Sequence, residues 1–328
     1  MKTSTIVLGI DGGASKTHAV LVDEQGKVRG VGHAGSSNWE GVGLDGAQAA
    51  FEQAVREAVT NAGIDRSDIA AAGYGLAGLD WPSDEDRLAP VLDTLGLKGP
   101  REMVNDAFLP LRAGTIDGVG LGAIAGTGTC VVGRNRAGDL ARSFGAGYPF
   151  TDWGGAGDIA GEAVHAIAAA YKGLGPETAL AGRMVAATGC VDVDDLMEKL
   201  MRWQVQIDST FAPQVFEAAH AGDAPAQAIV RRAGATIGAN AVAVARRLGM
   251  LDSPFPLVTA GGVFSSRSEL LNDSLLAAMH TENAQVELRY WEAPPVVGAV
   301  LLGLDLLELD VLPDTRVLAA EVEGALAR

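Results

Sequence analysis

Short apolar runs bounded by glycine-rich or polar turns open the chain and predict consecutive strands. The run Ile6–Ile10 ends at Asp11, and the turn Gly12–Ser15 separates it from a second run, Thr17–Val22. A weaker third run, Lys27–Gly32, follows a polar turn. Runs of this length between turn residues are typical of strands. The sequence therefore predicts three strands in succession at the N-terminus.

The same pattern recurs in the middle of the chain. An apolar run over Val119–Ala125 meets the turn Gly126–Gly128, and two further strand-like runs follow at Thr129–Gly133 and Asp139–Arg142. Self-similarity of this kind indicates a repeated architecture. We therefore expect two lobes, each of which opens with a glycine-turn hairpin.

The recurrence places the boundary between the lobes near residue 117. The N-terminal lobe is expected over residues 1–117 and the C-terminal lobe over residues 118–328, mostly helical after its first hairpin. Apolar residues spaced by three and four predict helices, and short apolar runs predict the remaining strands. The expected helices are 44–58, 85–95, 159–172, 195–203, 223–248, 269–279, 296–307 and 317–326, and the expected strands are 69–76, 101–104 and 255–259. The last expected helix could pack back on the N-terminal lobe.

Composition adds limits on partners. Hydrophobic residues make up 48% of the 328 residues and charged residues 20%, which is typical of a globular protein with a sizeable core. The net charge of −16 disfavours nucleic acid and anionic membrane surfaces as partners. It does not exclude a nucleotide, because backbone amides can hold a phosphate whatever the total charge.

Cysteine and histidine usage argues against a disulfide framework or a zinc site. The chain has two cysteines, Cys130 and Cys190, and its five histidines show no metal-ligand spacing. The first residues carry no signal-peptide pattern, and no apolar stretch reaches the about 18–20 residues of a membrane span. We therefore expect a cytoplasmic protein with no membrane segment.

The first glycine turn is a candidate phosphate-binding loop. Its glycines would let backbone N–H groups approach an anion, its polar side chains could add donors, and the preceding Asp11 could hold Mg²⁺ through water. The candidate phosphate-binding residues are Asp11, Gly12, Gly13, Ala14, Ser15, Lys16 and Thr17. The alternative is an ordinary hairpin turn between two strands.

Two further turns strengthen this interpretation. The second glycine turn, with Gly126, Thr127, Gly128 and Thr129, occupies the equivalent place in the second lobe. A third, Ala260–Phe264, follows an expected strand, and its Gly261 and Gly262 could accept an adenine or its ribose. Three such turns favour a polyphosphate ligand over coincidental loops.

Two other glycine patterns are weak signals. Gly41–Gly46 fits G-x-G-x-x-G, but no strand precedes it. Ser15–Thr17 resembles the end of a P-loop, but a serine stands where the glycine is required and a strand follows instead of a helix. Neither supports a dinucleotide or P-loop site.

The chain resembles the BadF/BadG/BcrA/BcrD ATPase family, within the superfamily of acetate and sugar kinases, heat-shock ATPases and actin. Within that family the likeness is to the N-acetylglucosamine kinase group. The motifs that carry the resemblance run in the family's order and are Gly9–Thr17, Gly75–Gly78, Val104–Ala107, Ile124–Thr129, Thr151–Gly154, Ala260–Phe264 and Pro294–Ala299. The set is specific as a whole, although each motif alone is not. The resemblance implies an α/β fold of two ribonuclease H-like lobes, with ATP and sugar in the cleft between them.

The resemblance also implies roles for individual residues. Asp106 would be the catalytic base on the sugar hydroxyl. The two glycine turns would bind the phosphates of ATP, Gly261 and Gly262 would bind its adenosine, and Asp11 would hold Mg²⁺. The residues expected to contact the sugar are Asn38, Trp39, Asn105, Asp106, Ala146, Gly147 and Asp152.

The sequence departs from the family pattern on the sugar side. The segment Gly145–Gly147 has alanine where the family commonly has tryptophan between two glycines, and Thr151–Gly154 replaces a common Gly-Asp-Glu-Gly. Loss of an indole at Ala146 removes a large rigid wall, and Trp153 could refill part of that space. The kinase assignment is therefore better supported than the choice of sugar.

Asp106 has a chemical role that does not depend on the resemblance. Phosphoryl transfer requires positioning and charge neutralisation, and one carboxylate can orient and deprotonate the accepting hydroxyl. The alternative for Asp106 is a helix N-cap. Other carboxylates have a plain interpretation as solvated surface, namely Asp65, Asp68, Asp84, Glu85 and Asp86.

The function expected from the sequence is an ATP-dependent kinase that phosphorylates the 6-hydroxyl of an amino sugar, most simply N-acetylglucosamine. Glucosamine or another hexose is the nearest alternative, and a sugar- and ATP-binding regulator without turnover is the next. A third alternative, an activator of a radical dehydratase, needs cysteines for an iron–sulfur cluster, and the positions of Cys130 and Cys190 disfavour it. A homodimer that binds ATP and the sugar is the expected assembly.

Overall fold

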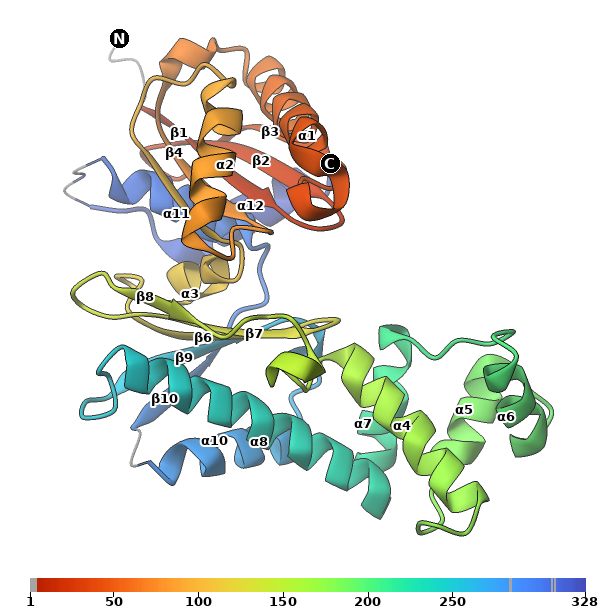
Figure 1. Cartoon of the computed structure of the whole chain (residues 1–328). Coiled ribbons are helices and arrows are strands. Elements are labelled where there is room, and N and C mark those ends of the chain that lie inside the picture. The colour runs from red at the N-terminus through yellow and green to blue at the C-terminus, as the bar shows by residue number, and fades with distance from the viewer. Residues whose placement is uncertain (1–4, 283–284, 308, 310) are drawn as a thin grey trace. The chain divides into compact units, whose positions relative to one another are not determined.

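The computed structural model describes residues 5–282, 285–307, 309 and 311–328, and these form two compact units (Figure 1). Unit 1 contains the described residues up to Val119 together with Trp291–Arg328, and unit 2 contains Gly120–Tyr290. Each unit is built around one five-stranded sheet.

The sheet of unit 1 has the order β3-β2-β1-β4-β5. Its strands are β1 (Ile6–Gly12), β2 (Thr17–Asp23), β3 (Val28–Ala34), β4 (Ile69–Leu76) and β5 (Arg101–Asn105). β1 pairs antiparallel with β2 and parallel with β4, which in turn pairs parallel with β5. β1, β4 and β5 therefore all end at one edge of the sheet, where Asp11 and Asp106 lie.

Helices cover both faces of this sheet. They are α1 (Trp39–Ala62), α2 (Pro82–Asp93), α3 (Phe108–Gly114), α11 (Val296–Asp305) and α12 (Thr315–Leu326), with a short 3₁₀ turn, η1 (Arg66–Asp68). On one face, Leu8 and Ile10 of β1 form a core with Phe51 of α1 and Leu88 of α2. Alternation along a strand turns Gly9 to the other face. A Cβ at Gly9 would lie 2.5 Å from the Val300 backbone nitrogen, so this glycine is what allows α11 to pack directly on β1.

The position of α11 corrects the expected lobe boundary. Residues 118–328 were expected in the C-terminal lobe, with only the last helix packing back, but residues 291–328 belong to unit 1. All residues of α11 from Val296 to Leu304 are buried. A helix that is apolar all round must be enclosed. In unit 1, Gly9 of β1 and Gly73 of β4 have no side chain, and this lets α11 pack against the sheet.

The sheet of unit 2 repeats this topology in the order β10-β9-β6-β7-β8. Its strands are β6 (Gly120–Ala125), β7 (Thr129–Arg134), β8 (Leu140–Arg142), β9 (Phe255–Ala260) and β10 (Val286–Tyr290). β6 pairs antiparallel with β7 and parallel with β9, just as β1 pairs with β2 and β4. The predicted repeat and the α/β class with two ribonuclease H-like sheets are confirmed.

Unit 2 carries more helix than unit 1. Its helical elements are η2 (Tyr148–Phe150), α4 (Ala156–Tyr171), α5 (Leu180–Thr188), α6 (Val193–Met201), η3 (Ser209–Phe211), α7 (Ala212–His220), α8 (Ala224–Arg247), α9 (Gly262–Ser265) and α10 (Glu269–His280). As predicted, Asp223 caps α8, because its side chain accepts a hydrogen bond from the Ala226 amide. No helix in the described part of the chain is long and apolar enough to cross a bilayer.

Candidate active site

The first glycine turn joins β1 to β2 in unit 1. The Gly13 amide donates to the Lys16 carbonyl at 3.0 Å, which closes the turn, and Ala14, Ser15 and Lys16 are exposed. Gly12 is buried, and a Cβ there would lie 2.7 Å from the Ser37 hydroxyl oxygen. The turn therefore presents its backbone from Ala14 to Lys16 to solvent, together with the Lys16 ammonium group.

Thr17 differs from its neighbours in this turn. Its side chain is fully buried, and its hydroxyl donates to the Gly35 carbonyl at 2.8 Å and contacts the Ser37 hydroxyl at 2.9 Å. This geometry ties the turn to the loop before α1. It supports a structural role for the Thr17 hydroxyl rather than the expected contact with phosphate.

Two carboxylates lie at one edge of the sheet near this turn, at the ends of strands that β4 separates. Asp11 lies near the end of β1 and Asp106 directly follows β5. Burial, and then the negative charge of Asp106, raise the pKa of Asp11 from 3.8 to about 7, while the Lys16 ammonium group lowers it. A like charge and a low-dielectric environment both disfavour ionisation. The expected Mg²⁺ ligand and the expected catalytic base thus lie at the same edge of the sheet, near enough for their charges to interact.

Asn105 fixes the backbone around Asp106. The Asn105 side-chain oxygen accepts from the Ala107 amide at 3.0 Å, and its amide nitrogen donates to the Asp80 carboxylate at 2.9 Å. The Asp106 amide donates to the Leu76 carbonyl of β4 at 3.4 Å. The N-cap of α3 is Ala107 and no side chain caps it, so the alternative of Asp106 as an N-cap is not observed.

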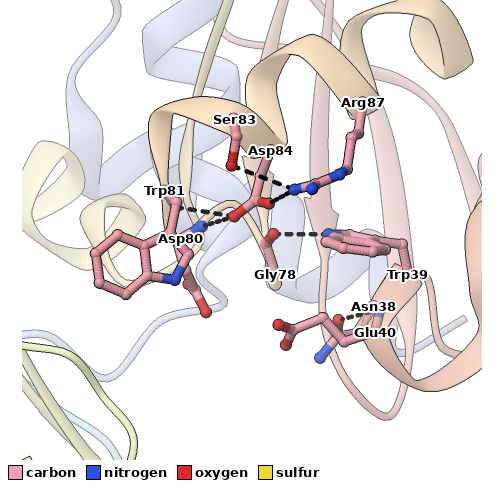
Figure 2. Close-up of polar contacts among 9 residues, drawn as sticks. All are labelled: Asn38, Trp39, Glu40, Gly78, Asp80, Trp81, Ser83, Asp84 and Arg87. Atoms are coloured by element: carbon pink, nitrogen blue, oxygen red, sulfur yellow. Dashed lines mark hydrogen bonds and ion pairs between the residues drawn. The ribbon is translucent and has the colours of Figure 1, made fainter.

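Asn38 and Trp39 begin α1 in the same unit (Figure 2). The Asn38 side-chain oxygen caps the helix by accepting from the Glu40 amide at 3.1 Å. The Trp39 indole donates its one N–H to the Gly78 carbonyl at 2.7 Å. Trp39 therefore has an apolar ring to offer a sugar but no remaining donor, whereas the Asn38 amide nitrogen is not used by the cap.

The second glycine turn lies in unit 2 against the start of α4. The amides of Ala156 and Gly157 donate to the carbonyls of Gly126 and Thr127 at 2.8 and 3.0 Å. Thr127 and Gly128 are exposed, whereas Thr129 is buried and its hydroxyl donates to the Asp152 carbonyl at 2.8 Å. The exposed part of the expected phosphate-binding turn is therefore Thr127–Gly128.

The expected adenosine element packs directly against this second turn. Gly261 has a φ of 96°, and a Cβ there would lie 2.4 Å from the Ala125 carbonyl at the end of β6. Only glycine combines this backbone conformation with so close an approach. The structure thus brings Gly261 and Gly262 next to the second glycine turn within unit 2.

A pocket of about 960 Å³ opens beside these glycines within unit 2. Its lining includes Ala156 at the start of α4, Phe216 of α7, Gly262 at the start of α9 and Arg267 shortly after α9. Ligand pockets of about 300–1,000 Å³ with mostly apolar walls and few polar groups are typical of small-molecule sites. The sequence indicated only the glycine end of this pocket, because its α7 wall comes from a helix that was not predicted.

The expected sugar-side residues of unit 2 are also brought together. The Ala146 amide donates to the Asp152 carboxylate at 3.1 Å, and the Asp152 amide donates to the Gly147 carbonyl at 3.2 Å. Trp153 is buried, and its ring lies 4.2 Å from the Arg232 guanidinium carbon. Ala146 is exposed and Trp153 lies against Arg232 of α8, so the refilling of space by Trp153 stays a prediction.

The carboxylates of unit 1 fit a magnesium ion only in part. Among the described residues no group of three or more His, Cys, Asp or Glu could hold a metal. Mg²⁺ usually keeps several waters and takes one or two carboxylates together with substrate phosphates. Asp11, next to the first glycine turn, matches that requirement, since a bound cation would favour the ionised carboxylate that burial and then the Asp106 charge disfavour.

Comparison with known proteins identifies the family. The family model described as the BadF/BadG/BcrA/BcrD ATPase family matches residues 8–303. The chain belongs to this family. The match covers most of both units, and it confirms the resemblance carried by the glycine turns and by the segment around Asp106.

The relatives of this chain include two named enzymes. The chain is 28% identical over 299 residues to the N-acetylmuramic acid/N-acetylglucosamine kinase of Clostridium acetobutylicum, covering 90% of this chain and 97% of that protein. It is 29% identical over 315 residues to the N-acetyl-D-glucosamine kinase of Dictyostelium discoideum, covering 92% and 98%. A crystal structure of a candidate N-acetylglucosamine kinase from Chromobacterium violaceum matches with a TM-score of 0.66 and 22% identity, over 91% of this chain and 99% of that chain. The likeness to the Chromobacterium violaceum structure supports the α/β fold described above.

Proposed function

We propose that the protein is an ATP-dependent kinase that transfers the γ-phosphoryl group to the 6-hydroxyl of an amino sugar, with N-acetylglucosamine as the first candidate. The observation that carries the proposal is that Asp11 and Asp106 lie at one edge of the unit 1 sheet, where the exposed first glycine turn also lies. Membership of an ATPase family and the names of the two relatives support it.

Each unit carries candidate groups of its own. In unit 2, the Thr127–Gly128 turn and the pocket beside Gly262 bind the phosphates and adenosine of ATP. In unit 1, the amides and Lys16 of the first turn neutralise charge on the transferred group. Mg²⁺, when bound near Asp11, supplies further charge neutralisation to the phosphates. Fixed dipoles and charges of this kind stabilise the charge that develops during transfer.

Asp106 acts on the accepting hydroxyl. A sugar hydroxyl is a weak nucleophile at neutral pH, and a carboxylate within about 2.6–3.2 Å of its oxygen can orient it and accept its proton. Asn105 and the β4 carbonyl of Leu76 hold the Asp106 backbone in place. Asn38 and the ring of Trp39 offer further contacts for the sugar in the same unit.

Unit 2 carries its own candidate residues for sugar recognition. Asp152 is almost fully buried, and its carboxylate accepts the Ala146 amide, so its position is well defined. We assign this segment to recognition of the sugar's 2-substituent, where the absence of an indole at Ala146 leaves room. Glucosamine or another hexose is the alternative substrate.

The test is ADP release from Mg-ATP with a panel of N-acetylglucosamine, N-acetylmuramic acid, glucosamine and glucose. A kinase of amino sugars releases ADP in proportion to the added sugar, and ³¹P NMR of the product shows a 6-phosphate. ATP binding without stimulation by any sugar would instead favour the non-catalytic regulator.

A further inference from the structure

A buried carboxylate on α2 organises the turn that follows β4. Asp84 is only 2% exposed, although its position in an acidic stretch predicted a solvated surface residue. One of its oxygens accepts from the amides of Asp80 and Trp81 at 3.1 and 2.8 Å, and the other pairs with Arg87 at 2.7 Å (Figure 2). A buried carboxylate is stable only when such donors satisfy it. Asp84 therefore fixes the backbone between β4 and α2.

That segment contacts several candidate residues of unit 1. The Ala77 amide donates to the Gly12 carbonyl at 2.8 Å, at the first glycine turn. The Gly78 carbonyl accepts from the Trp39 indole, and the Asp80 carboxylate accepts from the Asn105 side chain. A single stretch, residues 77–81, thus joins the phosphate-binding turn, the start of α1 and the end of β5.

Arg87 extends the same network to the aromatic ring. Its guanidinium carbon lies 5.3 Å from the centre of the Trp39 ring, and it also contacts the Ser83 hydroxyl at 3.2 Å (Figure 2). The pair Asp84–Arg87 therefore holds Trp39 from one side while the Gly78 carbonyl holds its indole N–H. Trp39 is fixed in orientation although it is only partly buried.

We propose that Asp80 and Asp84 are positioning residues for the phosphoryl acceptor, an inference that rests on the proposed function. Asp84 fixes the backbone of residues 77–81 by accepting from the Asp80 and Trp81 amides. The Asp80 carboxylate, held by that backbone, accepts from the Asn105 amide nitrogen and so orients the Asn105 side chain. The Asn105 side-chain oxygen then accepts a hydrogen bond from the Ala107 amide, and this bond fixes the chain on both sides of Asp106. Neither carboxylate needs to touch the sugar for this role.

Asp80 matters because an asparagine amide has two ends that differ chemically. With a carboxylate opposite its nitrogen, the Asn105 oxygen is left facing the Ala107 amide. Without that acceptor the amide can rotate, and the turn that carries Asp106 loses its side-chain hydrogen bond. Displacements of about 1 Å at a reacting group cost about 100-fold in rate.

The experiment compares Asp80→Ala, Asp80→Asn and Asp84→Ala, with Asp86→Ala as the matched control on the exposed face of α2. We expect Asp80→Ala and Asp84→Ala to lower kcat/KM for the sugar about 10–100-fold while KM for ATP changes less than about twofold. Asp80→Asn keeps an acceptor oxygen for Asn105 and should recover most of the activity. Asp86→Ala should match the unaltered enzyme.

Two results would overturn the proposal. One is an Asp80→Ala enzyme with unchanged kcat/KM, and the other is an Asp80→Asn enzyme as impaired as Asp80→Ala. If Asp84→Ala fails to fold, the comparison of Asp80→Ala with Asp80→Asn decides the question alone. Asp80 is only partly buried, whereas Asp84 is buried, so replacement of Asp80 disturbs the fold less. Failure of the proposed function itself is distinct, because the unaltered protein would then show no sugar-dependent ADP release.

Discussion

Replacement of Asp11 by asparagine should stabilise the protein at neutral pH while removing its activity. In the native state burial and the Asp106 charge raise the Asp11 pKa from 3.8 to about 7. Between these two pH values the native state keeps a proton that the unfolded chain releases, so native stability falls as the pH rises through this range and is constant above it. Asparagine has nearly the same shape and no charge, and it avoids this loss.

The size of the effect follows from the pKa. A change from 3.8 to about 7 corresponds to about 4 kcal/mol, and this is an upper value because the side chain is partly exposed and its surroundings can relax. At pH 8 we expect Asp11→Asn to raise the free energy of unfolding by about 1–4 kcal/mol. At pH 4 the two proteins should be nearly equal, because Asp11 is then protonated in the native state.

Urea denaturation at pH 4, 6 and 8 measures this difference through the midpoint of the transition. Asp86→Asn, on an exposed carboxylate of the same unit, is the control and should show no pH-dependent gain. If Asp11→Asn is no more stable than the unaltered protein at pH 8, then burial and the Asp106 charge do not disfavour ionised Asp11, and the account of the site is wrong.

Two further predictions concern specificity and nucleotide binding. Ala146→Trp should change the ratio of kcat/KM for N-acetylglucosamine to that for glucosamine by about tenfold, because one wall of a pocket typically discriminates by about that factor. An unchanged ratio would mean that residue 146 does not face the sugar. Gly261→Ala should raise KM for ATP about tenfold or more and lower Tm, because φ is 96° and the new Cβ would meet the Ala125 carbonyl at 2.4 Å. Gly182→Ala is the control, because nothing lies within 4 Å of a Cβ at this position on α5. It should leave KM for ATP unchanged and should not lower Tm, since alanine favours a helix over glycine.

The repeated strands could be predicted because their signal is local. A run such as Ile6–Ile10 followed by glycines determines a buried strand and a turn with little help from the rest of the chain. The register then places Asp11 near the carboxyl end of its strand, beside Gly75 of β4. The repeat predicted two lobes that each open with a hairpin, and the family resemblance implied the ribonuclease H-like class. The order of the strands and the position of β10 came from the structure.

The position of α11 could not be predicted in this way. Its residues are apolar and buried on every side. The sequence therefore predicts that the helix is enclosed, but it does not predict which sheet encloses it. The information lies in Gly9 and Gly73, whose missing side chains admit the helix, and these glycines are distant in the sequence. Packing of this kind depends on pairs of segments rather than on either alone.

Asp84 shows the same limit at the candidate site. In the sequence it is one of several acidic residues at the start of a helix, and such residues are usually solvated. The structure buries it because the amides of Asp80 and Trp81 converge on it, which depends on how the chain leaves β4. Asp106 was easier to predict, since it follows a short strand directly and its place at the sheet edge is local.

The most direct test of the central claim is the kcat of Asp106→Asn with saturating Mg-ATP and N-acetylglucosamine, measured beside its affinity for ATP. Loss of a general base typically costs about 10²–10⁴-fold, so kcat should fall by that factor while the Kd for ATP stays within about twofold. A folded Asp106→Asn enzyme that keeps near-normal kcat would contradict the assignment of Asp106 as the group that accepts the proton of the sugar hydroxyl.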